Sequence, residues 1–127
     1  MMLSSGKKKY LFTICKLGIE GNEIRAKEIA DFLQVKRPSV TKMLNALSED
    51  HLIEKEYYGK VSLSEQGLRL ANQLYTNFCL ISTYFQETLQ VSQENAEHDA
   101  LICVCELSDE SVNQFAALTL QQKCSPA

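Results

Sequence analysis

The apolar positions in the first 50 residues recur at helical spacing in three short blocks. A pair of glycines, Gly18 and Gly21, ends the first block, and the turn at residues 34–36 ends the second. Pro38 follows at a position suited to the first turn of a third helix, where its missing N–H costs nothing. The apolar residues of the three blocks are Tyr10, Leu11, Ile14 and Leu17; Ala26, Ile29, Ala30 and Leu33; and Val40, Met43, Leu44 and Leu47.

The rest of the chain predicts a small hairpin and three further helices. Two short runs of strand character, 52–56 and 61–63, flank residues 57–60, and a hairpin directly after a helix-turn-helix is typical of the wing of a winged-helix domain. Ser64 is a candidate N-cap for a fourth helix that reaches Phe85, and Ser92 and Ser108 are candidate caps for two more. The pattern predicts a mainly α-helical protein: a winged helix-turn-helix domain over residues 1–66 and an all-helical domain over 67–127. The fourth helix, at about 20 residues, is longer than so small a domain can cover alone, so we expect 67–127 to be a dimerisation domain.

The outer face of the predicted third helix is polar and basic. Arg37, Thr41 and Asn45 recur at intervals of four, with Ser39 and Lys42 beside them, and none of the five is acidic. The second helix of a helix-turn-helix presents such a face to the major groove of DNA. The alternative is that these residues form a solvated helix face without a partner.

Charge is distributed unevenly along the chain, which has 127 residues and a net charge of −3. Up to Leu70 it carries 12 basic and nine acidic residues, whereas the remainder carries one basic and seven acidic residues. We therefore expect a polyanion to bind the N-terminal part.

Composition excludes several classes of protein. With 45% apolar and 23% charged residues the sequence is neither disordered nor fibrous. The five cysteines are odd in number and lack the spacing of a disulfide framework, no leader is apparent, and no apolar stretch reaches the roughly 20 residues of a membrane span. These features predict a soluble cytoplasmic protein without a membrane partner. Since His51 has no plausible nucleophile nearby in sequence and His98 has the position of a solvated helix residue, we do not expect an enzyme.

Two segments, Val35–Met43 and Leu52–Val61, resemble the iron- and manganese-dependent repressors, the group of the diphtheria-toxin repressor and the manganese-transport regulator. The resemblance extends over residues 8–118 and includes the runs 63–67 and 107–110. It implies a homodimer that binds a palindromic operator in double-stranded DNA, in the short form that lacks an SH3-like domain. The residues that it assigns to DNA contacts are Lys36, Arg37, Pro38, Ser39, Thr41, Lys42 and Asn45 of the helix and Tyr57, Tyr58 and Lys60 of the wing.

The resemblance also implies manganese or iron as a cofactor, but the ligand positions have changed. Carried over by spacing, they fall on Lys9, Phe12, Phe78, Leu101, Val104 and Cys105. Five of these six side chains cannot coordinate a divalent cation at neutral pH, because they have no free lone pair or carry a positive charge.

These substitutions predict that Phe12, Phe78, Leu101 and Val104 form an apolar plug where relatives hold the ion. Burial of one Phe contributes about 2–3 kcal/mol, enough in principle to hold the same arrangement without a metal. The protein would then need no cofactor and would bind DNA constitutively.

Three alternatives remain open. In the first, the four apolar residues are ordinary core residues of a diverged family member whose regulatory switch lies elsewhere. In the second, the protein responds to metal or redox state through a rebuilt site that uses residues from the set Cys79, His98, Cys105 and Glu106. In the third alternative, the chain is a dimeric interaction module that has lost operator binding.

Overall fold

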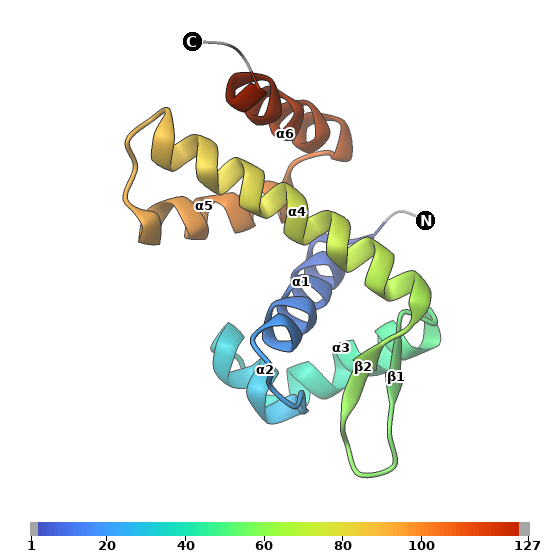
Figure 1. Ribbon diagram of the computed structural model, residues 1–127. Coiled ribbons are helices and arrows are strands. Elements are labelled where there is room, and N and C mark those ends of the chain that lie inside the picture. Colours follow the sequence, from blue (N-terminus) through green and yellow to red (C-terminus); the bar gives the residue numbers. More distant parts are fainter. Residues whose placement is uncertain (1–2, 125–127) are drawn as a thin grey trace. The chain divides into compact units, whose positions relative to one another are not determined.

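The structure of the chain is a computed structural model, which describes residues 3–124 and, within them, the side chains of residues 3–122. In this range the chain forms six helices and one two-stranded sheet, which confirms the mainly α-helical fold (Figure 1). The elements are α1 (Ser5–Ile19), α2 (Ala26–Leu33), α3 (Arg37–Glu49), β1 (Ile53–Lys55), β2 (Val61–Leu63), α4 (Glu65–Glu87), α5 (Gln93–Glu106) and α6 (Asp109–Cys124).

The chain divides into two compact units, one up to Gln73 and one from Leu74 onwards. The division falls inside α4, so the first turns of this helix belong to the N-terminal unit and its remainder to the C-terminal unit. A domain boundary after residue 66 stays a prediction.

The N-terminal unit packs its first three helices around the apolar stripes expected from the sequence. Leu11, Ile29 and Leu47, one from each helix, are completely buried. The hairpin β1–β2 follows α3 and projects from the helices (Figure 1). Its strands are antiparallel, with Ile53 opposite Leu63, and each has only three residues, so the first strand is shorter than the predicted 52–56.

Two backbone contacts attach this hairpin to the rest of the unit. The N–H of Val61 donates to the carbonyl of Ile24 at 2.8 Å, which joins β2 to the segment before α2. The N–H of Ser64 donates to the carbonyl of Leu52 at 3.0 Å, so the first residue after β2 is bonded to the residue before β1. The base of the wing is therefore held on both strands.

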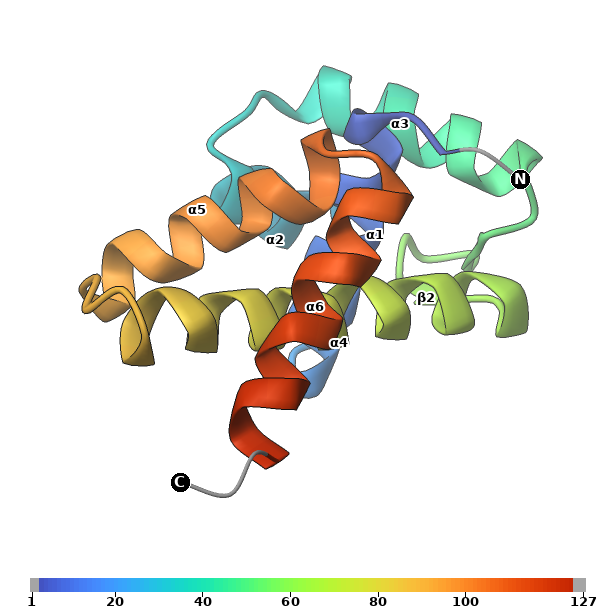
Figure 2. The same ribbon diagram turned by 90° about the horizontal axis from the view of Figure 1, so that it is seen from above.

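The C-terminal unit contains the remainder of α4 together with α5 and α6. Phe115 of α6 packs edge-on against Tyr84 and Phe85 of α4, with ring centroids 5.2 and 5.7 Å apart. This contact agrees with Figure 2, in which α6 runs across α4. Small buried side chains on α5 and α6 complete the packing: Ala96, Ala100, Val104, Val112 and Ala116.

The three serine caps predicted from the sequence are present. The side-chain oxygens of Ser64, Ser92 and Ser108 accept the backbone N–H of the residue three positions later, at 3.0, 3.3 and 3.2 Å. Each cap satisfies one of the N–H groups that the first turn of a helix leaves without a partner. Across residues 3–124, no helix is both long enough and apolar enough for a bilayer span.

Candidate nucleic-acid interface

The turn between α2 and α3 orients the candidate recognition helix. Gln34 ends α2 with φ 58°, a left-handed conformation that reverses the chain, and the N–H of Val35 donates back to the carbonyl of Ala30 at 3.1 Å. Lys36 is extended and occupies the N-cap position of α3, with Pro38 in the first turn. This is the tight helix-turn-helix connection that the sequence predicts.

One face of α3 is buried and the other is open to solvent. Val40, Leu44 and Leu47 anchor the helix in the core with exposed fractions of 0 to 3%. The seven residues predicted to contact DNA from this region all lie on the exposed side of the turn and helix: Lys36, Arg37, Pro38, Ser39, Thr41, Lys42 and Asn45. These seven residues include hydrogen-bond donors and three cations but no acid. The acid of α3 is the exposed Glu49 in its last turn, four residues after Asn45.

Asn45 has a partner that sequence reasoning missed. Its amide oxygen accepts a hydrogen bond from the ammonium group of Lys55 on β1. This bond links the exposed face of α3 to the wing and adds a cation beside it. Lys55 carried no signal in the sequence, because the contact depends on how the hairpin folds back over α3.

The wing tip is strongly exposed and stiffened by local contacts. The turn uses Gly59 with φ 88°, and the N–H of Gly59 donates to the carbonyl of Glu56 at 2.9 Å. The side chain of Tyr57 is fully exposed and meets the ring of Tyr58 edge-on, with centroids 6.5 Å apart. Lys60, which ends the turn, is half-buried at the start of β2.

A charged cluster outside the predicted site supports the wing. The guanidinium of Arg25 lies over the ring of Tyr58 at 5.9 Å and pairs with Glu23 at 2.9 Å. That hydrogen bond and charge lower the pKa of Glu23. A hydrogen bond to Glu56 raises the pKa of the Tyr58 hydroxyl. Tyr58 is therefore held from two sides, and its hydroxyl stays protonated at neutral pH.

A cation at the start of α1 is paired with an acid that follows α3. The ammonium group of Lys7 pairs with Asp50 at 2.6 Å, and both side chains are about 30% exposed. Because Asp50 directly follows α3, the pair ties the N-terminus of α1 to the end of the candidate recognition helix. It also neutralises an acid close to that helix.

The positions that the family resemblance assigns to metal ligands do not fit a manganese or iron ion. Lys9 is exposed, Phe12, Phe78, Val104 and Cys105 are buried, and Leu101 is half-buried. Only the Cys105 thiol in this set could become a ligand, and a single thiolate ligand does not make a site for a cation that prefers carboxylate and imidazole groups.

The candidates for a rebuilt site are also dispersed. Cys79, His98 and Glu106 are exposed, and the imidazole Nδ1 of His98 lies 3.1 Å from a carboxylate oxygen of Asp99. Among the described residues no three His, Cys, Asp or Glu side chains come together as a metal-binding group.

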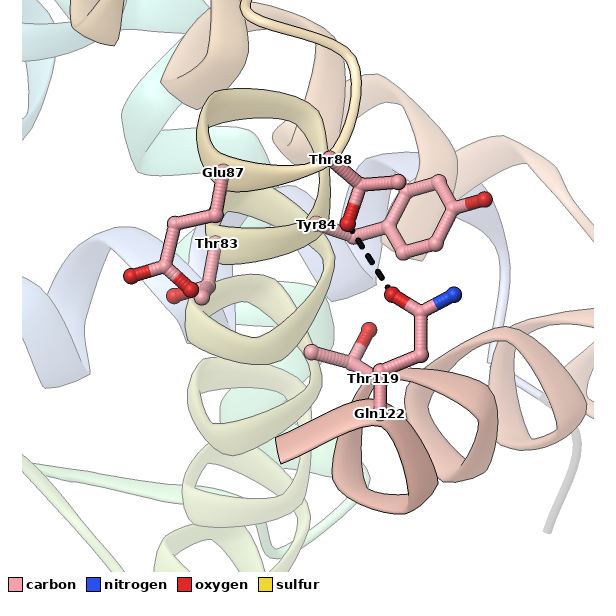
Figure 3. A pocket seen from close by; sticks show the side chains of 6 residues that line it. All are labelled: Thr83, Tyr84, Glu87, Thr88, Thr119 and Gln122. Atoms are coloured by element: carbon pink, nitrogen blue, oxygen red, sulfur yellow. Dashed lines mark hydrogen bonds between the residues drawn. The ribbon is translucent and has the colours of Figure 1, made fainter. Parts of the chain in front are cut away.

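A polar cavity of about 350 Å³ lies between the ends of α4 and α6 (Figure 3). Across it the hydroxyl of Thr88 donates to the amide oxygen of Gln122 at 2.9 Å, while the carboxylate of Glu87 points away from that bond. Glu87 is the one acid among its lining residues. The cavity therefore lacks the several carboxylate or imidazole ligands that a divalent cation needs.

Comparison with known proteins agrees with this arrangement. Residues 2–61 match the sequence model of the iron dependent repressor, N-terminal DNA binding domain. The chain is 33% identical over 122 residues to the transcriptional regulator MntR of Salmonella typhimurium, which covers 91% of this chain and 73% of that protein.

Two solved structures have the same fold. The manganese regulator SloR superposes with a TM-score of 0.74 at 25% identity over 93% of this chain and 54% of its own. The apo form of the manganese-activated repressor ScaR superposes with a TM-score of 0.66 at 31% identity over 86% of this chain and 52% of its own. The chain thus spans about half the length of these two proteins.

Proposed function

Because the chain belongs to the iron-dependent repressor family, we propose that it is a cytoplasmic, sequence-specific DNA-binding regulator of transcription and not an enzyme. The observation that supports this most directly is the exposed face of α3. It follows a helix-turn-helix turn and carries cations and hydrogen-bond donors between Arg37 and Asn45, with the acid Glu49 only in the last turn of the helix. It lies next to an exposed wing.

Within this proposal the residues of the interface have different roles. Pro38, Ser39 and Thr41 approach base edges or thymine methyl groups, while the cations of α3 bind backbone phosphates. Tyr57, Tyr58 and Lys60 bring the wing to phosphates or to the minor groove. The amide oxygen of Asn45 accepts from the Lys55 ammonium group, which leaves the NH2 group of Asn45 as its donor toward DNA.

Alanine substitutions of Arg37 and Lys42 test the proposal. Each removes one phosphate contact, so we expect weaker binding to every sequence and a slope of log K against log salt that falls by about 0.9. Arg69→Ala is the matched control, because this arginine is 75% exposed on α4 and pairs only with Glu65 among the contacts described. If neither Arg37→Ala nor Lys42→Ala changes affinity or salt slope, the alternative of a dimeric interaction module replaces this proposal.

We further propose that the protein acts as a homodimer on a palindromic operator. The C-terminal unit leaves several large apolar side chains open to water, with exposed fractions between 41 and 52% for Leu89, Ile102, Leu107, Leu118 and Leu120. Association would remove such surface from water. Sedimentation equilibrium should give twice the chain mass of 14.3 kDa, and a monomer at micromolar concentration would contradict this.

The final part of the proposal is that the regulator needs no metal. An apolar plug of Phe12, Phe78, Leu101 and Val104 takes the place of the ion. Three of these side chains are at most 7% exposed. Metal analysis of the purified dimer should find manganese and iron well below one atom per chain. Stoichiometric metal would instead favour a site rebuilt from Cys79, His98, Cys105 or Glu106.

A further inference from the structure

A groove in the N-terminal unit shares one residue, Lys60, with the candidate DNA-binding surface. Its volume is about 390 Å³, within the range of roughly 300–1,000 Å³ that is usual for small-molecule sites. Its walls come from the second half of α1, the segment before α2, strand β2 and the first turns of α4, which can be followed in Figure 1.

The groove is apolar along most of its length. The aliphatic side chains that line it are Ile14, Ile19, Ile24, Val61, Leu63 and Leu68. Two of them, Ile19 and Leu68, are 59% and 46% exposed, so this surface is hydrated in the free protein. Gly18 leaves room in the wall, because a Cβ built there would meet one atom within 4 Å, the Cδ1 of Ile24 at 3.7 Å.

The polar groups of the groove favour an anion. Lys60 is the one charged residue among those that line it, and no lining residue is acidic. Glu23 lies close enough for Lys60 to help lower its pKa, but this carboxylate is already paired with Arg25 at 2.9 Å. Asn22, Ser62 and Asn72 add uncharged hydrogen-bonding groups.

The contact between Cys15 and Asn72 also orients one of these groups. The Cys15 thiol, at the edge of the groove, donates to the amide oxygen of Asn72 at 3.6 Å. This bond occupies the acceptor of the Asn72 amide and leaves its NH2 group as a donor.

We propose that this groove binds a small amphipathic anion, with an aliphatic body between α1 and α4 and a carboxylate at Lys60. If the chain binds DNA as proposed above, the ligand acts as an effector. It takes Lys60 away from DNA phosphate and fills the space behind β2. The bound protein therefore holds DNA less tightly than the free protein.

Octanoate is the probe, with octan-1-ol as its uncharged analogue, and binding is followed without DNA in ¹H–¹⁵N correlation spectra of the full chain. We expect saturable shifts at the amides of Gly18, Asn22, Ser62 and Leu68. Octan-1-ol should bind roughly three- to fivefold more weakly, because it lacks the charge that pairs with Lys60.

Variants assign the binding to the groove. Gly18→Leu fills it and should abolish the shifts, whereas Gly18→Ala should only weaken them. Lys60→Gln should make octanoate bind no better than octan-1-ol, and the control Lys27→Gln, an exposed lysine of α2 outside the groove, should leave both affinities unchanged. Equal octanoate binding in Gly18→Leu, or equal binding of the two probes to the unmodified protein, would overturn the proposal.

The effector role is tested separately on operator DNA. Saturating octanoate should weaken DNA binding and reduce the salt slope by about 0.9, the contribution of one phosphate contact, and it should have no further effect in Lys60→Gln. Octanoate that binds the groove but leaves DNA affinity unchanged would refute the effector role. A protein that fails to bind DNA at all would contradict the proposed function, while the spectra would still test the groove.

Discussion

Replacing Gly67 with alanine should destabilise the protein strongly although it adds only one methyl group to a helix. Gly67 is the third residue of α4, and a Cβ at this position would lie 1.9 Å from the carbonyl oxygen of Leu52 and 2.9 Å from its carbonyl carbon. Real Cβ atoms hardly ever approach other heavy atoms within 3.0 Å, so α4 and the base of the wing must separate by about 1 Å.

The cost follows from the contacts that this separation breaks. The Ser64 N–H donates to Leu52 at 3.0 Å and the Ser64 hydroxyl donates to the carbonyl of His51 at 2.7 Å. Loss of the two bonds costs about 1 kcal/mol each. Overpacking adds about 1–3 kcal/mol. The better helix propensity of alanine returns about 1 kcal/mol. The net loss is therefore about 2–4 kcal/mol.

Urea unfolding followed by circular dichroism at 222 nm measures this loss. We expect Gly67→Ala to lower the midpoint at an unchanged slope, or equivalently to lower Tm by roughly 10–25 °C. Gly18→Ala is the matched control, since its methyl group lies 3.7 Å from Ile24, at ordinary contact distance, and should stabilise by up to about 0.5 kcal/mol. If the two variants are equally stable, the close approach of α4 to Leu52 is wrong.

Other perturbations have smaller expected effects. Ser64→Ala removes the cap of α4 and should cost about 1 kcal/mol in urea unfolding, and a change below 0.3 kcal/mol would contradict the cap. Lys7→Ala should lower the free energy of unfolding by at most about 1 kcal/mol, because the ion pair with Asp50 is part-exposed. The difference between variant and unmodified protein should shrink in 0.5 M salt. A difference that grows with salt would contradict an ion pair. Burial raises the pKa of the Cys15 thiol, so its alkylation by iodoacetamide should be slow at pH 7 and should accelerate only at a higher pH than for an ordinary thiol. The exposed Cys79 should react before Cys15. Mass spectrometry that finds Cys15 modified first would refute this order.

The local elements could be predicted because their signals lie within a few residues. The helical blocks, the turn before Pro38 and the caps at Ser64, Ser92 and Ser108 depend on neighbours three or four positions away. Of the predicted apolar positions of α3, Val40, Leu44 and Leu47 are buried and Met43 is half-buried, and the polar face opposite them is exposed.

Contacts between distant residues could not be predicted in this way. Nothing in the sequence indicates that Gly67 lies against Leu52, because the contact forms only when the hairpin between them brings the two residues together. The pairs Asn45 with Lys55 and Arg25 with Tyr58 likewise appear only when the hairpin folds against α3 and the segment before α2. The groove beside Gly18 was also not predicted, because four separate segments of the chain form it.

One titration tests directly whether DNA binding depends on metal. A fluorescent duplex from the upstream region of the protein's own gene is titrated at fixed salt, once with excess chelator and once with added manganese or iron. Equal and tight binding in both conditions is the result that the apolar plug predicts. Binding that appears only with metal would contradict it and would mean that Phe12 and Phe78 do not replace a metal site.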